Sequence, residues 1–335
     1  MDILHVKCEH MRATKAFIVS EKNIILFTGK QVIILDKQLN LINKLVGFNC
    51  AYDGYLSPDE TKLLVVASDN KFYIVSLVSY EVIKVIVKGG YDENLSGNGC
   101  WSFDGKSVYI PALNPKSVLS DLRRYSITEP NKYESVMREK YWITKILAIP
   151  ELERYLITGY DRNLLKDYFI WYDGNAFTHY EIEEFDDYIL NVEVDVKNSV
   201  IRLFSFDNCE IYNFNGKKVS SLDFTPEIIK CDFFDVFKDI PELSDESKKK
   251  LRSMISFLGI NDISAKEKIN STCLTPDLKQ LFLCTSSGIV IMDLQTCKEI
   301  NRIKIEYGAN KVCFIENNMF LVEGYDSVKV FKIGV

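Results

Sequence analysis

Side chains suited to metal binding or proton transfer are scarce, since the 335 residues include only three histidines, at positions 5, 10 and 179. His5, Cys8 and His10 lie close enough in sequence to suggest a metal site. On a strand, however, successive side chains point to opposite faces, so Cys8 and His10 would share a face while His5 points away. We therefore expect no metal site here, and no cofactor for the chain.

Nucleophilic catalysis has little support in the sequence. His179 would share a strand face with Glu181, but no G-x-S-x-G segment is present. A Ser-His-Asp arrangement assembled from distant segments stays an open alternative. Neither GxxxxGK[ST] nor GxGxxG occurs, so nothing favours nucleotide phosphate binding. We expect no catalytic residues.

Acidic residues cluster in several expected loops. Paired carboxylates can act as general acid and base or bind hard cations, but the spacing of a calcium loop is missing. The simplest interpretation is a solvated surface; the functional alternative is complementarity to a basic peptide or protein segment. With one neighbouring arginine, the candidate contacts of these loops are Asp92, Glu93, Asp161, Arg162, Glu184, Asp186 and Asp187.

Charge and composition limit the partners. The net charge of −6, from 41 basic and 47 acidic residues, gives no broad positive field for nucleic acid. No run of 18 apolar residues predicts a membrane span, and the first residues lack the pattern of a secretory signal. The nine cysteines form no CxxC pair, and most lie in apolar runs, as expected for free thiols in a reducing compartment. We expect a cytoplasmic protein with no nucleic-acid or membrane partner.

A repeated turn organises the elements that would position these residues. Short runs rich in Val, Ile, Leu, Phe and Tyr alternate with turn residues, which predicts many strands. One turn between two such runs recurs at intervals of 40 to 47 residues, with a single interval of 80. Counting an earlier copy at 20–27, seven copies fit, and the long interval holds an insertion of about 35 residues.

Each copy offers four strands, which is typical of a propeller blade. The last copy, ending at SVKVFKI (327–333), is one outer strand short, and DILHVKC (2–8) has no blade of its own. We expect the N-terminal strand to complete the last blade and close the ring without a free edge. The outer strand of the fifth blade is left open between KKVSSLDF (217–224) and EIIKCDFF (227–234).

Three of these turns carry a family resemblance. SPDE (57–60), SFDGKSVYI (102–110) and TPDLK (275–279) resemble the SPDGK turn of WD-repeat and YVTN-type propellers. Strand-ending aspartates stand roughly where those families have a Trp-Asp dipeptide, although neither Trp-Asp nor Gly-His occurs here. The resemblance covers nearly the whole chain and implies the fold; it transfers no activity, although YVTN-type propellers also resemble lactonase-type propeller enzymes.

Propeller geometry would place the short turns on one face and the irregular loops on the other. The segment 225–266 is the longest of these irregular segments, and a helix is expected from about Ser244 to Leu258. Its apolar stripe and the phenylalanines before it either pack on the propeller or dock a partner. They are Phe233, Phe234, Phe237, Leu251, Met254, Ile255 and Leu258.

The sequence thus predicts an all-β fold in one domain, 1–335: a seven-bladed β-propeller of four-stranded blades, closed by its N-terminal strand. A helical insertion, 225–266, is expected between blades 5 and 6. We expect a non-catalytic scaffold that binds a protein or peptide, favouring a basic one, on the irregular face. The alternatives are a lactonase-like hydrolase and a small-molecule sensor that binds at the channel mouth.

Overall fold

The described residues fold almost entirely into β-strands, with one short 3-10 helix, η2 (Pro150–Leu152), and no α-helix. The all-β prediction is therefore confirmed for these residues. The computed structural model describes residues 3–6, 14, 16–68, 71–87, 94–95, 98–114, 119–129, 132–139, 141–161, 163–183, 185, 189, 191–205, 208–223, 230–231, 263–264, 269–277, 279–293, 296, 298–306, 308–324 and 327–334. No helix within this part of the chain is long and apolar enough to cross a membrane.

The first half of the chain forms three antiparallel sheets of consecutive strands. The first has the order β2 (Ala16–Val19), β3 (Ile24–Phe27), β4 (Gly29–Leu35), β5 (Leu41–Leu56), β6 (Lys62–Ala67), β7 (Lys71–Ser76) and β8 (Val82–Val87). The second has β10 (Cys100–Trp101), β11 (Ser107–Asn114), β12 (Leu119–Ser126) and β13 (Tyr133–Glu139), with β9 (Asn94–Leu95) also on β11. The third has β14 (Tyr141–Ile149), β15 (Arg154–Asp161), β16 (Lys166–Tyr172) and β17 (Phe177–Glu181).

The second half repeats the pattern in three four-stranded sheets. One has β18 (Asn191–Asp195), β19 (Val200–Phe204), β20 (Asn208–Asn213) and β21 (Lys218–Asp223). The next has β24 (Ile269–Leu274), β25 (Gln280–Thr285), β26 (Gly288–Asp293) and β27 (Lys298–Lys304). The last has β28 (Lys311–Glu316), β29 (Met319–Glu323), β30 (Val328–Ile333) and β1 (Ile3–Val6), and a two-stranded sheet pairs β22 (Lys230–Cys231) with β23 (Ile263–Ser264).

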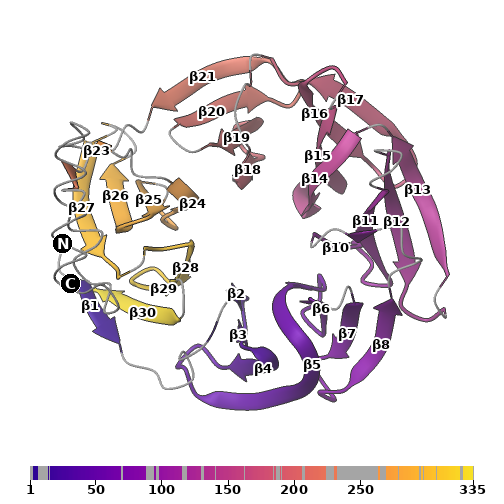
Figure 1. Ribbon diagram of the computed structural model, residues 1–335, viewed down its shortest axis with the longest axis horizontal. Helices are drawn as coiled ribbons and strands as arrows, with labels where there is room; N and C mark the ends of the chain where they lie inside the picture. The colour runs from indigo at the N-terminus through magenta and orange to yellow at the C-terminus, as the bar shows by residue number, and fades with distance from the viewer. Residues whose placement is uncertain are drawn as a thin grey trace, which may run out of the picture.

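These sheets lie side by side around a central opening (Figure 1). The first strand of each repeat, such as β14, β18 or β24, is nearest the opening, and the fourth strand lies at the rim. Middle strands are buried along their length, as in Ile24–Phe27, whereas rim strands such as Lys298–Lys304 are largely exposed. This burial explains why the middle strands are continuous apolar runs rather than alternating ones.

The repeated turn has one hydrogen-bonded form in its three best copies. The Ser57 hydroxyl donates to Asp59 Oδ1 at 2.6 Å and accepts from the Lys62 backbone N–H at 2.9 Å. Ser102 and Thr275 make the same pair of bonds in their own turns. The Ser/Thr-x-Asp pattern therefore recurs because its side chains satisfy the backbone of a tight connection between two strands.

The apolar core is divided into layers between neighbouring sheets. Each of seven clusters combines buried side chains from two successive repeats, as Ile110 of β11 packs with Leu64 of β6. One cluster joins the two ends of the chain, since Leu26 and Leu35 pack with Leu321 of β29. The sheet faces, rather than one central core, therefore hold the described strands together.

The end strands pair as the sequence predicts. Ile3 of β1 lies opposite Ile333 of β30, and the antiparallel register continues to Val6 opposite Val330. The outer strand left open in the sequence is β21, from KKVSSLDF, because Lys218–Asp223 pairs with β20. Lys230–Cys231 of the other candidate pairs instead with Ile263–Ser264.

One expectation from the sequence is wrong, and another concerns residues that the structure does not describe. The first two predicted blades are not separate sheets, because β5 is one 16-residue strand that pairs with β4 and then with β6. The change of partner falls between Val46, which pairs with Gln31 of β4, and Ala51, which pairs with both Gly29 and Ala67. A bulge between Ala51 and Asp53 follows it. The helix predicted for 244–258 lies outside the described residues, as does most of 225–266.

Candidate functional site

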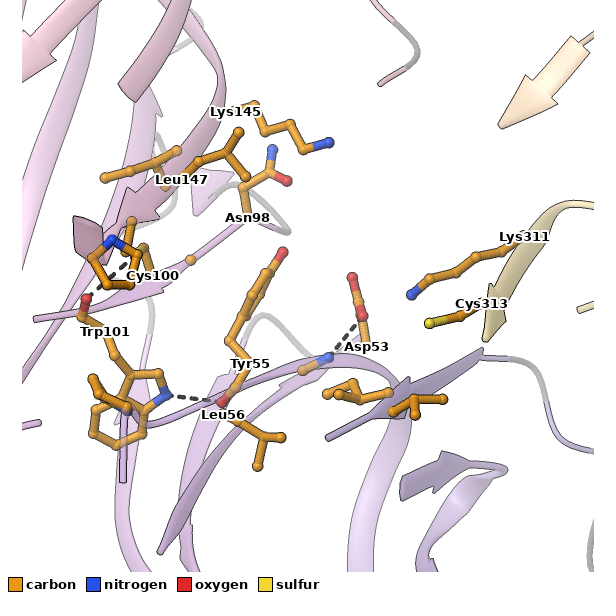
Figure 2. Close-up of a pocket in the computed structure, with 18 of the residues that line it drawn as sticks. Asp53, Tyr55, Leu56, Asn98, Cys100, Trp101, Lys145, Leu147, Lys311 and Cys313 are labelled. Atoms are coloured by element: carbon orange, nitrogen blue, oxygen red, sulfur yellow. Dashed lines mark hydrogen bonds between the residues drawn. The ribbon is translucent and has the colours of Figure 1, made fainter. Parts of the chain in front are cut away.

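A pocket of about 840 Å³ opens at the centre of the ring of sheets. Its walls come from the innermost strands β2, β5, β10, β14 and β28, together with the turns that follow several of them (Figure 2). Strands far apart in sequence meet here because each repeat places its first strand toward the opening. A pocket built on strand ends of a rigid ring is a favourable place for a ligand.

The lining changes from polar to apolar along the strands. In the segments of the inner strands that line the pocket, the residues nearest the start of each segment are polar: Asp53, Asn98, Thr144, Lys145 and Lys311. Farther along the same strands and in the turns that follow, the wall is formed by Leu56, Pro58, Trp101, Phe103, Leu147 and Pro150. The pocket therefore has a charged end and an apolar end.

Backbone bulges bring two of the charged side chains to the wall. The register of β5 shifts between Ala51 and Asp53, and that of β14 shifts between Ile143 and Lys145. A bulge places an extra residue in one strand and re-aims the side chains beside it. Asp53 and Lys145 line the pocket immediately after these shifts.

The side chains of both lysines extend into the pocket. Figure 2 shows the side chains of Lys145 and Lys311 reaching from opposite sides toward a space that the carboxylate of Asp53 also enters. Lys145 Nζ donates to Asn191 Oδ1 at 2.9 Å, and Lys311 Nζ donates to the carbonyl oxygen of Phe17 at 3.0 Å. Within the part of the chain that the structure describes, neither ammonium group makes a direct ion pair.

The electrostatics of the pocket shift several protonation equilibria. Burial and, to a smaller extent, the positive charge of Lys311 lower the pKa of Lys145 to about 8, although Glu193 and Asp53 oppose the shift. Burial raises the pKa of Asp53, against the effect of Lys311. Near these groups, burial also raises the pKa of Glu193 and of Glu323 to about 7. Lys145 and these two acids therefore change protonation state close to neutral pH.

Side-chain hydrogen bonds tie the inner strands of neighbouring repeats together around the pocket. Each bond runs from a side chain on or just before one inner strand to the adjacent repeat. The bonds are Trp101 Nε1 to Tyr55 O (2.8 Å), Asn98 Nδ2 to Thr144 O (2.7 Å), Lys145 Nζ to Asn191 Oδ1 (2.9 Å), Asn191 Nδ2 to Thr272 Oγ1 (3.5 Å), Asn270 Nδ2 to Ala309 O (2.8 Å) and Lys311 Nζ to Phe17 O (3.0 Å). The ammonium groups of Lys145 and Lys311 are therefore held in place by hydrogen bonds to the neighbouring repeats.

This arrangement can bind an anion or supply an amine nucleophile. A lysine ammonium carries three N–H donors, and one of them is used by the bond to Asn191 or to Phe17. Within the described part of the chain, the remaining donors of both lysines have no hydrogen-bond partner and can be offered to a ligand. The lowered pKa of Lys145 also leaves a fraction of its amine neutral near pH 7, the form that attacks carbonyl carbon.

Most of the site residues predicted from the sequence cannot be compared with this pocket. Asp161 is described: it is buried, and its Oδ1 accepts hydrogen bonds from the backbone N–H groups of Asn163 and Leu164. Asp161 therefore shapes a local turn and does not line the pocket. The others lie outside the described residues: Asp92, Glu93, Arg162, Glu184, Asp186, Asp187, Phe233, Phe234, Phe237, Leu251, Met254, Ile255 and Leu258.

His5 and His179, two of the histidines considered for metal binding or catalysis, do not line the pocket. His5 is exposed on β1 beside the Phe331 ring, and Cys8 and His10 lie outside the described residues. His179 is exposed on β17, whose Glu181 pairs with Lys166. Among the described residues there is no group of three or more His, Cys, Asp or Glu side chains arranged to hold a metal ion.

No protein-family model matches the chain, and no curated protein matches it significantly.

Proposed function

We propose that the chain is a seven-bladed β-propeller closed by its N-terminal strand, and that it is a non-catalytic binding module. The fold part of this proposal is supported by the seven apolar layers between successive repeats, one of which joins the first repeat to the last. It is also supported by the pairing of Ile3–Val6 with β30 and by the hydrogen bonds that run from repeat to repeat around the pocket. The long strand β5 would then serve as the outer strand of one blade and the inner strand of the next.

The observation that carries the functional proposal is the position of the charged end of the pocket. Lys311 is the first residue of β28, Asp53 follows the point where β5 begins to pair with β6, and Lys145 lies in the middle of β14 directly after its bulge. They mark the end of the pocket nearer the starts of these pairings, which in a propeller is the side of the interblade links. The irregular loops predicted from the sequence belong to the same face. A protein or peptide partner that lies across these loops would therefore reach the pocket with one of its side chains or ends.

A small-molecule sensor is the second candidate. Its support is the volume of the pocket, about 840 Å³, which lies within the roughly 300–1,000 Å³ of typical ligand sites. No observation favours the lactonase-like hydrolase, because Asp53 is the single carboxylate among the described residues that line the pocket. Two features act on the charge of the partner in opposite directions. The acidic loops favour a basic protein segment, whereas the two pocket lysines favour an anionic group on that segment.

The cytoplasm remains the proposed compartment. The described cysteines are free thiols, and Cys100, Cys209 and Cys284 are buried in the sheet packing. Thiols in this state are typical of a reducing compartment.

Affinity purification from the native host, followed by mass spectrometry, tests the proposal. The baits are the wild-type chain, the double variant Lys145→Met and Lys311→Met, and a chain lacking 239–262, each first checked for a cooperative melting transition. A stoichiometric protein that the wild type retains and the double variant loses supports a partner bound at the pocket face. Retention by the wild type and the double variant alike contradicts it, and loss only on deletion assigns the partner to the segment 225–266.

A further inference from the structure

We propose that the central pocket binds an amphipathic organic anion, with a carboxylate or phosphate head group between Lys145 and Lys311 and an apolar body along the opposite end of the wall. This inference deepens the proposed binding module and rests on it for the role of the pocket. It adds the chemical class of the ligand. It also names the two side chains that would hold the ligand's charge.

The lining of the head-group end carries two ammonium groups and one carboxylate, and neither lysine makes a direct ion pair among the described residues. Lys145 and Lys311 are anchored by a neutral amide oxygen and a neutral carbonyl oxygen, at 2.9 and 3.0 Å. Asp53 is the one acidic group among the described lining residues, and its Oδ1 accepts from the Gly54 backbone N–H at 2.8 Å. With two cations and one anion in the wall, a bound carboxylate or phosphate would balance the charge of the lining.

Other charged groups near the lysines lie outside the lining. Glu193 acts on Lys145, and Glu323 acts on Lys311, without a direct ion pair to either lysine among the described residues. The pKa of each of these two acids is raised to about 7, so near neutral pH each is partly protonated. Their negative charge therefore competes only in part with that of a ligand.

The remainder of the pocket suits an apolar body. Leu56, Trp101, Phe103, Leu147 and Pro150 line the end away from the lysines. The indole N–H of Trp101 is already bonded to the Tyr55 carbonyl oxygen, so the ring contributes no free donor to this end of the wall. A hydrocarbon chain or ring placed against these side chains would be removed from water, which favours its binding.

Pyridoxal 5′-phosphate is the first probe, because it carries a phosphate, an aldehyde and a ring in one small molecule. The neutral amine of Lys145 attacks the aldehyde carbon, water leaves and an imine forms; sodium borohydride then delivers hydride to the C=N bond and leaves a stable secondary amine. Peptide mapping locates the label. We expect it mainly on Lys145 at substoichiometric probe, because the lowered pKa of this residue leaves part of its amine neutral near pH 7.

Competition tests the ligand class directly. Excess octanoate, which has a carboxylate and an apolar tail, should slow labelling of Lys145 about tenfold or more, and inorganic phosphate should slow it less. Equal protection by the two anions would overturn the amphipathic part of the proposal. A label spread over exposed lysines such as Lys217, unaffected by octanoate, would overturn the anion site itself.

Variants separate anion binding from amine reactivity. Lys145→Arg keeps the positive charge and cannot form the imine, so it should lose the label and keep the rise in melting temperature that octanoate causes. Lys145→Met should lose both, and Lys311→Met should weaken octanoate binding about tenfold, whereas Lys217→Met should change neither. If Lys145→Arg also loses the octanoate effect while it still folds, the charge is not what the pocket uses.

The outcomes distinguish this inference from the proposed function. A partner that co-purifies with the wild type, while octanoate and pyridoxal phosphate do not bind at the pocket, overturns the anion site and leaves the binding module intact. Octanoate binding without any protein partner supports the anion site and contradicts the protein-binding form of the module.

Discussion

Replacing Glu193 by glutamine should make the protein more stable above neutral pH and leave its stability almost unchanged in acid. Glu193 lies on β18 opposite Arg202, and burial raises its pKa from 4.5 to about 7, although Arg202 and Lys145 oppose the shift. The native state therefore keeps a proton that the unfolded chain releases from about pH 4.5 upward. Stability is lost as the pH rises from 4.5 to about 7, and glutamine, which does not ionise, removes that loss.

The magnitude follows from the size of the shift. One pKa unit corresponds to about 1.4 kcal/mol, so the gain at pH 8.5 is at most about 3 kcal/mol. For a chain of 335 residues with an unfolding entropy of about 2 cal/mol/K per residue, this is a rise of about 4 °C in melting temperature. The shift should shrink through the window between pH 7 and 4.5 and approach zero below it.

Melting curves of wild type and Glu193→Gln, recorded from pH 4 to 8.5, measure this difference. Glu316→Gln is the matched control, because Glu316 is exposed on the inner strand β28 and should show no such pH dependence. A melting difference that is constant across the whole pH range would refute the reasoning, since it would mean that the substitution changes packing rather than a protonation equilibrium. A variant that is less stable at pH 8.5 would refute it as well.

Three structural predictions follow from the packing around the ring. Trp101→Phe removes the N–H that donates to the Tyr55 carbonyl oxygen at 2.8 Å, and denaturant unfolding should show a loss of about 1–3 kcal/mol; no loss would mean that the bond is not formed in solution. Gly54→Ala should cost about 1–3 kcal/mol in the same assay, because the added Cβ would lie 2.7 Å from the Leu64 carbonyl oxygen on the neighbouring strand; an unchanged midpoint would contradict the close approach of β6 to Gly54. Deleting residues 1–7, which include β1 (Ile3–Val6), exposes the edge of β30 and should lower the melting temperature and cause self-association visible by light scattering; a stable monomer would contradict the closing role of β1.

The fold could be predicted to the extent that local chemistry repeats along the chain. Ser57, Ser102 and Thr275 mark turns because their hydroxyls bond the backbone and the aspartate two residues later, and that requirement is visible in sequence. The continuity of β5 between two repeats could not be predicted in this way. It depends on the irregular backbone between Val46 and Asp53, which includes positive φ at Gly47 and Cys50 and a bulge after Ala51, and the repeated turn does not mark this segment.

The candidate site was largely hidden from sequence reasoning. Lys145 and Lys311 are ordinary lysines in polar positions, and only the ring brings them to one pocket with Asp53. The available signal was positional, since all three stand near the beginning of the first strand of a repeat or shortly after a bulge in it. Sequence reasoning turned instead to the acidic loops and the segment 225–266, which vary most in length but lie mainly outside the described residues.

Isothermal titration of octanoate and of its neutral analogue octanamide is the measurement that tests the central pocket most directly. The account predicts one octanoate site per chain, octanamide binding weaker by about tenfold or more, and loss of that preference in folded Lys145→Met or Lys311→Met. Equal binding of the two ligands, or an octanoate affinity that neither substitution changes, would contradict it.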